Sequence, residues 1–263
     1  VTADPNGQPR FVLGEGSERR TTGSYYTPPA LVAELVQRVL GDQLRGEGQR
    51  KESHDAQQAA SRRLLSLRIL DPACGSGHFL LAAARTLGMT LARLRSGEDE
   101  PAPEQARQAT RDVIRHCIYG VDKNPLAVEL CKVALWIESH EPDKPLTFLD
   151  HRIRCGDSLV GVLDLNVLDQ GIPENAFERV EGDDPRIVNS VRRENRLGQR
   201  GARALPAILA GAAQTKQALA KLAQRARAIE NLPDDTPADI QRKAAQFETL
   251  EAEARRLRVA CNL

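Results

Sequence analysis

One segment limits the fold more than any other: a short apolar run that ends at an acid and leads directly into a glycine turn. Leu67–Leu70 is mostly apolar and is followed by Asp71-Pro72. Gly75 and Gly77 come next, and Phe79–Leu94 then carries apolar residues at helical spacing. Glycine permits the tight backbone that joins a strand to a helix and brings N–H groups close to a ligand. The segment therefore predicts a strand, a glycine turn and a helix.

Two later segments repeat the strand-to-helix order. Cys117–Asp122 has the composition of a buried strand and ends on an acid, and Asn124-Pro125 is suited to begin the helix that follows. Ile153–Cys155 is a weaker strand that leads into Gly156-Asp157-Ser158. A further helix is predicted over Glu104–Arg115. Strands that alternate with helices predict an α/β fold with a parallel sheet.

The rest of the chain is predicted to form less regular parts. Residues 1–22 are expected to be an extended arm, 23–165 the α/β part, 166–203 an irregular connection and 204–263 a helical hairpin. Gly46–Ala60 is polar without periodicity and is expected to be an exposed connection.

The hairpin is predicted to consist of helices Ile208–Asn231 and Ala238–Val259 with one apolar seam between them. The seam comprises Leu219, Leu222, Ile229, Leu250 and Leu257. Arg225 and Arg227 are the arginines that would touch a DNA backbone if the hairpin does so at all; the alternative is a solvated hairpin.

Charge and cysteine content exclude several classes. The net charge is +1, but the residues from Arg186 onward include 15 basic and 8 acidic side chains. The five cysteines form no C-x-x-C pair, so neither a zinc site nor a disulfide framework is expected, and no metal is assigned. With no apolar run of membrane-spanning length and no signal peptide, we expect no membrane partner and a cytoplasmic location. Oligomeric state is left open.

Three ligands compete for the glycine turn. A dinucleotide motif requires a third glycine where Leu80 stands, and a phosphate loop requires Gly-Lys-Ser/Thr, which does not follow. S-adenosylmethionine remains, because its cationic groups suit an acid at a strand end such as Asp71. The alternative is a turn that only connects a strand to a helix.

The next two strand-end acids support a cofactor. Asp122 can accept hydrogen bonds from both ribose hydroxyls, and Asp157 can accept one from the exocyclic amine of adenine. Each acid alone could equally be an ordinary strand-end or cap residue. Three in successive strand-end positions favour a ligand.

Four motifs resemble those of adenine-specific DNA methyltransferases of restriction–modification systems. Asp71–Leu80 resembles the cofactor motif, Ser24–Pro29 the upstream motif, Tyr119–Ala127 the ribose motif and Cys155–Leu159 the adenine motif. With the upstream motif first, the order resembles the gamma arrangement of large single-chain restriction and modification enzymes. Lys123 departs from the pattern, because the family often has an aliphatic residue there.

The resemblance implies an incomplete Rossmann-like methyltransferase sheet followed by a mostly helical insertion. It also implies methyl transfer from S-adenosylmethionine to adenine N6 in a specific sequence of double-stranded DNA, in a restriction–modification or phage-defence system. The cofactor-binding residues it implies are Tyr26, Thr27, Asp71, Ala73, Cys74, Gly75, Gly77, Phe79, Asp122, Lys123, Asp157 and Ser158.

The family's catalytic tetrad, Asn or Asp followed by two prolines and an aromatic, does not occur in this sequence. Asn124-Pro125-Leu126 lacks the second proline and is interpreted as a helix cap. No catalytic residue is therefore assigned, and these residues alone are expected to be inactive. The alternatives are a non-catalytic cofactor-binding or assembly module, and a methyltransferase acting on RNA or protein.

Overall fold

The computed structural model describes residues 2–3, 9–10, 27–42, 44, 53–160, 174–179, 182–200 and 212–261. They form two compact units. The first comprises Val1–Ser139 and Arg152–Gly156, and the second comprises His140–His151 and Asp157–Leu263. Most of the arm predicted over residues 1–22 lies outside the described residues, apart from the antiparallel two-residue strands β1 (Thr2–Ala3) and β2 (Pro9–Arg10).

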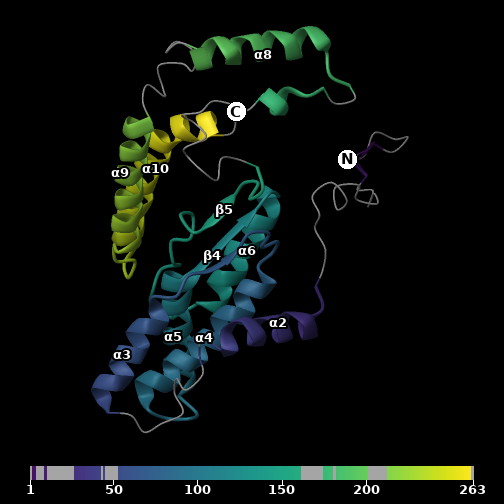
Figure 1. The fold of residues 1–263 in the computed structure, drawn as a ribbon. Coiled ribbons are helices and arrows are strands. Elements are labelled where there is room, and N and C mark those ends of the chain that lie inside the picture. The colour runs from purple at the N-terminus through teal and green to yellow at the C-terminus, as the bar shows by residue number, and fades with distance from the viewer. Residues whose placement is uncertain are drawn as a thin grey trace. The chain divides into compact units, whose positions relative to one another are not determined.

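The first unit contains a three-stranded parallel sheet in the order β3-β4-β5 (Figure 1). Its strands are β3 (Ile69–Asp71), β4 (Ile118–Asp122) and β5 (Ile153–Cys155). Each strand lies within or overlaps a segment where the sequence predicted one. The α/β prediction is therefore confirmed as a mostly helical chain with a small parallel sheet.

Helices cover one face of this sheet. α4 (His78–Ser96) packs on β3 and β4, and α6 (Pro125–Glu138) packs on β4 and β5. Ile118 and Ile153 are fully buried beneath them because alternate strand residues point to the same side. α5 (Pro103–Cys117) packs mainly against α4.

Residues of the opposite face are more accessible. Leu70 pairs in register with Tyr119 and is 60% exposed. The Tyr119 ring carries the guanidinium of Arg152 at 4.5 Å and that of Arg68 at 5.9 Å from its centroid. Parallel sheets are usually covered on both faces. Within the described residues of the first unit, this face is more polar and more open than that.

Two helices precede the sheet. α2 (Pro29–Gly41) has a proline in its first turn and packs on α4. The exposed connection predicted over Gly46–Ala60 is wrong at its C-terminal end, because α3 (His54–Leu65) begins there. Ser53 caps α3 by accepting the Ala56 N–H at 3.4 Å, and Ala60 and Leu64 are buried. Two apolar residues four positions apart are enough to anchor a polar helix.

The second unit corrects another prediction. Residues 166–203 were expected to be irregular, but they include the 3-10 turn η1 (Glu174–Phe177) and the helix α8 (Pro185–Arg200). The reason is local. Asp184 accepts the Arg186 N–H at 2.8 Å, and Pro185 stands in the first turn, where its missing N–H costs nothing.

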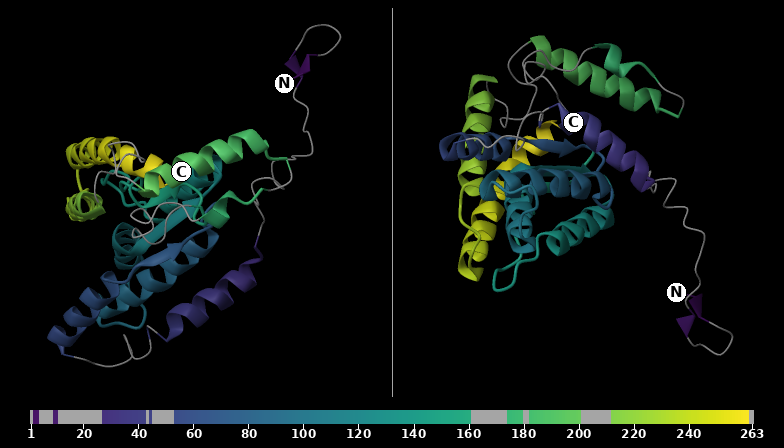
Figure 2. Two further views of the ribbon diagram at one scale, coloured as in Figure 1. Left: turned by 45° about the horizontal axis from the view of Figure 1, so that its top comes forward. Right: turned by 90° about the horizontal axis from the view of Figure 1, so that it is seen from below.

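The C-terminal helices are α9 (Ala212–Glu230) and α10 (Pro237–Cys261). They lie side by side in Figures 1 and 2, with Ile229 and Leu250 buried and an ion pair between Arg225 and Glu253. The Leu257 side chain lies outside the described part. Among the described residues no helix is both long and apolar enough to cross a membrane.

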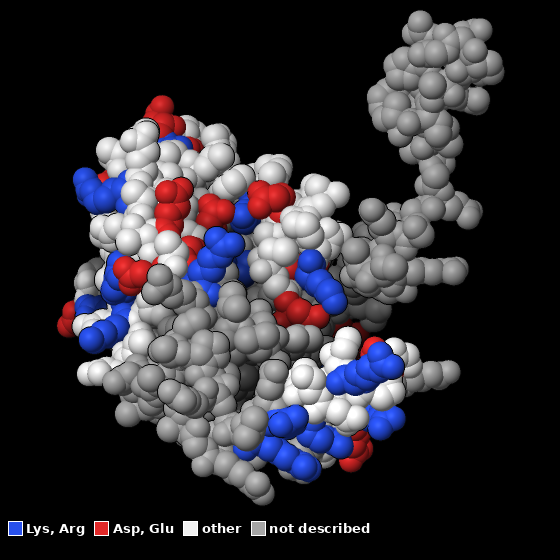
Figure 3. Space-filling view, turned by 90° about the horizontal axis from the view of Figure 1, so that it is seen from above, with Lys and Arg blue, Asp and Glu red and all other residues white. Residues whose placement is uncertain are grey.

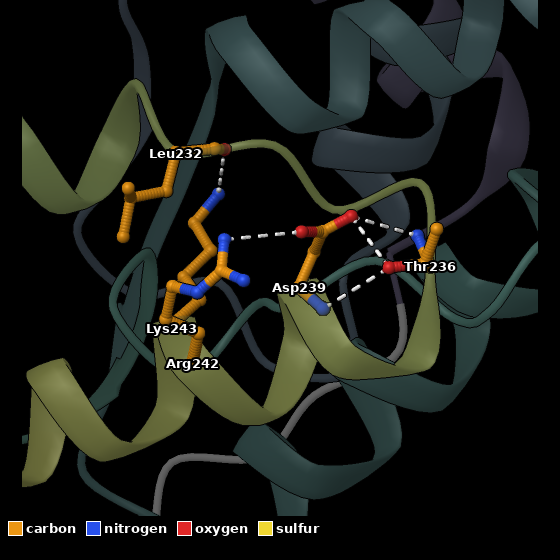
Figure 4. Close-up of polar contacts among 5 residues, drawn as sticks. All are labelled: Leu232, Thr236, Asp239, Arg242 and Lys243. Atoms are coloured by element: carbon orange, nitrogen blue, oxygen red, sulfur yellow. Dashed lines mark hydrogen bonds and ion pairs between the residues drawn. The ribbon is translucent and has the colours of Figure 1, made fainter.

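The turn between α9 and α10 is tied by side chains (Figure 4). The hydroxyl of Thr236 donates to the Asp239 carboxylate at 2.6 Å and accepts the Asp239 N–H at 3.2 Å, which caps α10. The buried Lys243 ammonium donates to the carbonyl of Leu232 at 3.3 Å. These bonds give the hairpin a defined turn.

Candidate functional site

Two carboxylates lie at the same edge of the sheet. Asp71 ends β3 and Asp122 ends β4, and the strands are adjacent and parallel. In register, Asp71 stands opposite Gly120, so Asp122 extends two residues further along its strand. Ligands of open α/β sheets bind at this carboxyl edge.

The glycine turn lies between β3 and α4. Gly75 and Gly77 both have left-handed backbones, with φ of +54° and +91°. The Cys74 N–H donates to the carbonyl of Val121 at 2.9 Å, and the Gly77 N–H donates to the carbonyl of Cys74 at 2.8 Å. The turn is thereby held against the end of β4.

The Asp122 carboxylate joins this turn to the next helix. Its Oδ2 accepts the Gly75 N–H at 2.8 Å, and its Oδ1 accepts the Asn124 N–H at 2.8 Å. A carboxylate has about four lone-pair positions, so two remain for further donors. Asn124 in turn caps α6 by accepting the Leu126 N–H at 3.0 Å, in agreement with its interpretation as a cap.

The space around the turn differs between its glycines. A Cβ on Gly75 would have no atom of the described residues within 4 Å, so Gly75 borders open space in this part of the chain. A Cβ on Gly77 would lie 2.7 Å from Cys131 Sγ, and one on Gly120 would lie 2.9 Å from Leu80 Cδ1. The turn is thus packed beneath and open above, which leaves room for a ligand over Gly75.

Two buried thiols form part of that packing. Cys131 hydrogen-bonds to Cys74, and this contact together with burial raises the pKa of the Cys131 thiol far above its usual value. Cys74 is buried beneath the turn, where its sulfur packs against Gly120. Sequence reasoning did not single out Cys131 and Gly120 as supports of the turn, because that role depends on contacts between distant segments.

Asp71 has an unfavourable electrostatic setting. Burial raises the pKa of its carboxyl, the hydrogen bond from the Ala73 N–H at 3.0 Å lowers it, and the nearby Asp122 raises it again. A positive charge placed beside Asp71 would relieve this repulsion. These two carboxylates therefore suit a ligand that carries a cationic group.

The structure brings together six of the predicted residues: Asp71, Ala73, Cys74, Gly75, Gly77 and Asp122. Phe79 is half-buried in the first turn of α4, Lys123 is exposed next to Asp122, and Thr27 is half-buried just before α2. Tyr26 lies outside the described residues.

Asp157 and Ser158 belong to the second unit and are exposed. Asp157 accepts the Leu159 N–H at 3.0 Å and follows Gly156 directly in the chain. Their predicted contact with adenine stays a prediction.

A separate cavity of about 370 Å³ lies between α3 and the C-terminal end of α4. Its lining includes Gln57, Arg62, Leu94 and Arg95. Since the glycine turn precedes the other end of α4, this cavity is not part of the strand-end site.

Part of the chain matches a known family. Residues 47–157 match the family model described as MmeI, DNA-methyltransferase domain. The match contains the glycine turn, both strand-end acids and the start of the Cys155–Leu159 motif, whereas Ser24–Pro29 lies before it. The resemblance predicted from the motifs is confirmed for this part of the chain.

Two relatives are consistent with this class. A protein of Methanocaldococcus jannaschii, named as a type II restriction enzyme and methyltransferase, is 34% identical over 110 residues, which are 38% of this chain and 9% of that protein. The adenine-specific methyltransferase PglX of Streptomyces coelicolor is 39% identical over 71 residues, 27% of this chain and 5% of that protein. The chain thus matches less than a tenth of each relative's length.

Proposed function

We propose that this chain is the cofactor-binding part of a DNA methyltransferase that transfers a methyl group from S-adenosylmethionine to N6 of adenine. The observation that carries the proposal is the Asp122 carboxylate, which holds the Gly75 N–H across the edge of two parallel strands. The domain match over residues 47–157 supports the same reaction class.

The residues at the strand ends fit the cofactor's chemistry. S-adenosylmethionine supplies the methyl group and carries an ammonium, a ribose and an adenine. Asp71 is the acid that would neutralise the ammonium, and Asp122 has lone pairs left for the ribose hydroxyls. The open space over Gly75 admits the cofactor, and Phe79, Lys123, Asp157 and Ser158 are proposed to complete its surroundings.

The motifs and the relatives support the proposed target base and context. One relative is named as an adenine-specific methyltransferase and the other as a restriction enzyme and methyltransferase. We therefore propose double-stranded DNA as the partner, a Rossmann-like fold for the complete domain, and a cytoplasmic restriction–modification or phage-defence role. Because transfer to N6 needs mainly orientation of the amine, positioning should dominate the rate.

Binding of S-adenosylmethionine carrying a ¹³C-labelled methyl group tests the proposal. NMR line broadening detects dissociation constants up to the millimolar range, so weak binding by this chain is measurable. Asp122→Asn should weaken binding by about 1–3 kcal/mol, or about 5- to 150-fold, because a charged acceptor is lost. The matched control is Asp99→Asn, an exposed acid beyond the other end of α4.

The two variants should differ in their affinity for the cofactor. Asp99→Asn should leave binding unchanged. Equal binding by the wild-type chain and Asp122→Asn, or no line broadening by the wild-type chain at millimolar cofactor, would remove the cofactor from this site.

A further inference from the structure

We infer that helix α8 is a contact element for the phosphate backbone of duplex DNA, through Arg186, Arg193 and Arg196. The choice of DNA rests on the proposed function. The surface itself is defined by charge and exposure, which are independent of the strand-end site.

α8 is the most basic helix of the second unit. Between Pro185 and Arg200 the sequence has five arginines and one glutamate, whereas α10 has five basic and four acidic residues. In Figure 3, lysine and arginine side chains (blue) gather on part of the surface with few acidic side chains (red) among them. Clustered arginines release counterions from DNA, which makes binding favourable and salt-dependent.

Three of these arginines share one side of the helix. Arg186, Arg193 and Arg196 are seven and three residues apart, so their side chains project from the same face, and all three are exposed. They extend over about 15 Å of helix axis, which corresponds to about four base-pair steps of duplex DNA. Arg192 lies at the margin of this face and donates to the carbonyl of Phe177 at 2.8 Å, which ties α8 to η1.

The opposite side of α8 is apolar. Ile187 is 64% exposed and Val191 is 43% exposed, four residues apart on that side. A helix with an apolar side and a basic side presents its arginines away from any protein surface that it packs against. This arrangement favours a polyanion on the basic side.

The hairpin is a weaker candidate for the same role. Arg225 is paired with Glu253, and Arg242 is paired with Asp239 at 3.4 Å. These carboxylates reduce the positive potential that DNA would meet. The contact expected for Arg225 and Arg227 stays a prediction, and the test below compares α9 directly with α8.

The test is DNA binding by the full 263-residue chain, measured by fluorescence anisotropy with a duplex of about 20 base pairs over a salt series. The variant carries Arg186→Gln, Arg193→Gln and Arg196→Gln, and the control carries Lys221→Gln, Arg225→Gln and Arg227→Gln on α9. Both lose three positive charges and replace them with a good helix former. Circular dichroism checks that both keep their helices.

Three lost phosphate contacts have a calculable effect. The slope of log affinity against log salt should fall by about 2.7, so the affinity lost between about 50 and 200 mM salt becomes roughly 40-fold smaller. The change should be the same for unrelated DNA sequences. The α9 control should retain the wild-type slope.

Three results would overturn the inference: no salt-dependent DNA binding by the wild-type chain, equal slopes for the α8 variant and the α9 control, or tighter binding to an RNA duplex than to DNA. None of them depends on the cofactor. The Asp122→Asn experiment therefore tests the proposed function even if the α8 variant shows no effect on DNA binding. Likewise, the DNA-binding experiment tests α8 even if Asp122→Asn leaves cofactor binding unchanged.

Discussion

The packing of Gly77 against Cys131 leads to a quantitative prediction about the glycine turn. Gly77→Ala places a Cβ in a left-handed backbone and 2.7 Å from Cys131 Sγ. The backbone cost is about 1–2 kcal/mol. Overpacking adds about 1–3 kcal/mol, and the stiffer unfolded chain returns about 0.4–1 kcal/mol. We expect a net loss of about 2–4 kcal/mol in the free energy of unfolding.

Gly75→Ala is the matched control. Gly75 is also left-handed, but a Cβ there has no atom within 4 Å. Only the backbone cost applies, so the loss should be about 1 kcal/mol after the unfolded-state gain. The difference between the two variants measures packing alone.

Urea denaturation measures both losses, and the fluorescence of Trp136 reports on the helix that contains Cys131, because this tryptophan is the only one in the chain. Adding Cys131→Ala to Gly77→Ala removes the close contact, and a double-mutant cycle should show about 1–3 kcal/mol of favourable coupling. Equal losses for Gly75→Ala and Gly77→Ala, with no coupling to Cys131→Ala, would refute the reasoning. If Gly77→Ala alone does not fold, recovery of folding by the double variant gives the same answer.

Two further predictions concern stability. Gly88→Ala forces apart α4 and α5, because its Cβ would lie 2.8 Å from Thr110 Cα, and overpacking should outweigh the gain in helix propensity by about 1–2 kcal/mol. Gly41→Ala, where no atom of the described residues lies within 4 Å of the new Cβ, should cost nothing in the same urea titration. Asp71→Asn should raise the free energy of unfolding above that of the wild type by more at pH 7 than at pH 3. The reason is that burial and Asp122 raise the pKa of Asp71 above 3.8 in the folded state. The folded state then holds this proton more tightly, so wild-type stability falls as pH rises from about 3.8 through the raised pKa, and the variant lacks that fall. If the free energy of unfolding of the variant has the same pH dependence as that of the wild type, the pKa of Asp71 is not raised in the folded state.

The sequence by itself determined the elements that carry the candidate site. Apolar runs ending at Asp71 and Asp122, with glycines after the first, were sufficient to predict two parallel strands and the turn between strand and helix. These signals are local, because strand composition, glycine backbone freedom and helix capping act between residues close in the chain.

Only the tertiary structure decided which groups meet. The bond from the Gly75 N–H to Asp122, the position of Cys131 beneath Gly77 and the pairing of Arg225 with Glu253 all join residues far apart in the chain. The polar composition of α3 and α8 also kept sequence patterns from predicting these two helices. α3 forms with two buried apolar residues and a capping serine, and α8 begins where Asp184 accepts the Arg186 N–H. Neither helix carries a long apolar repeat in its sequence. Contacts between distant segments depend on packing and register, which a local pattern does not encode.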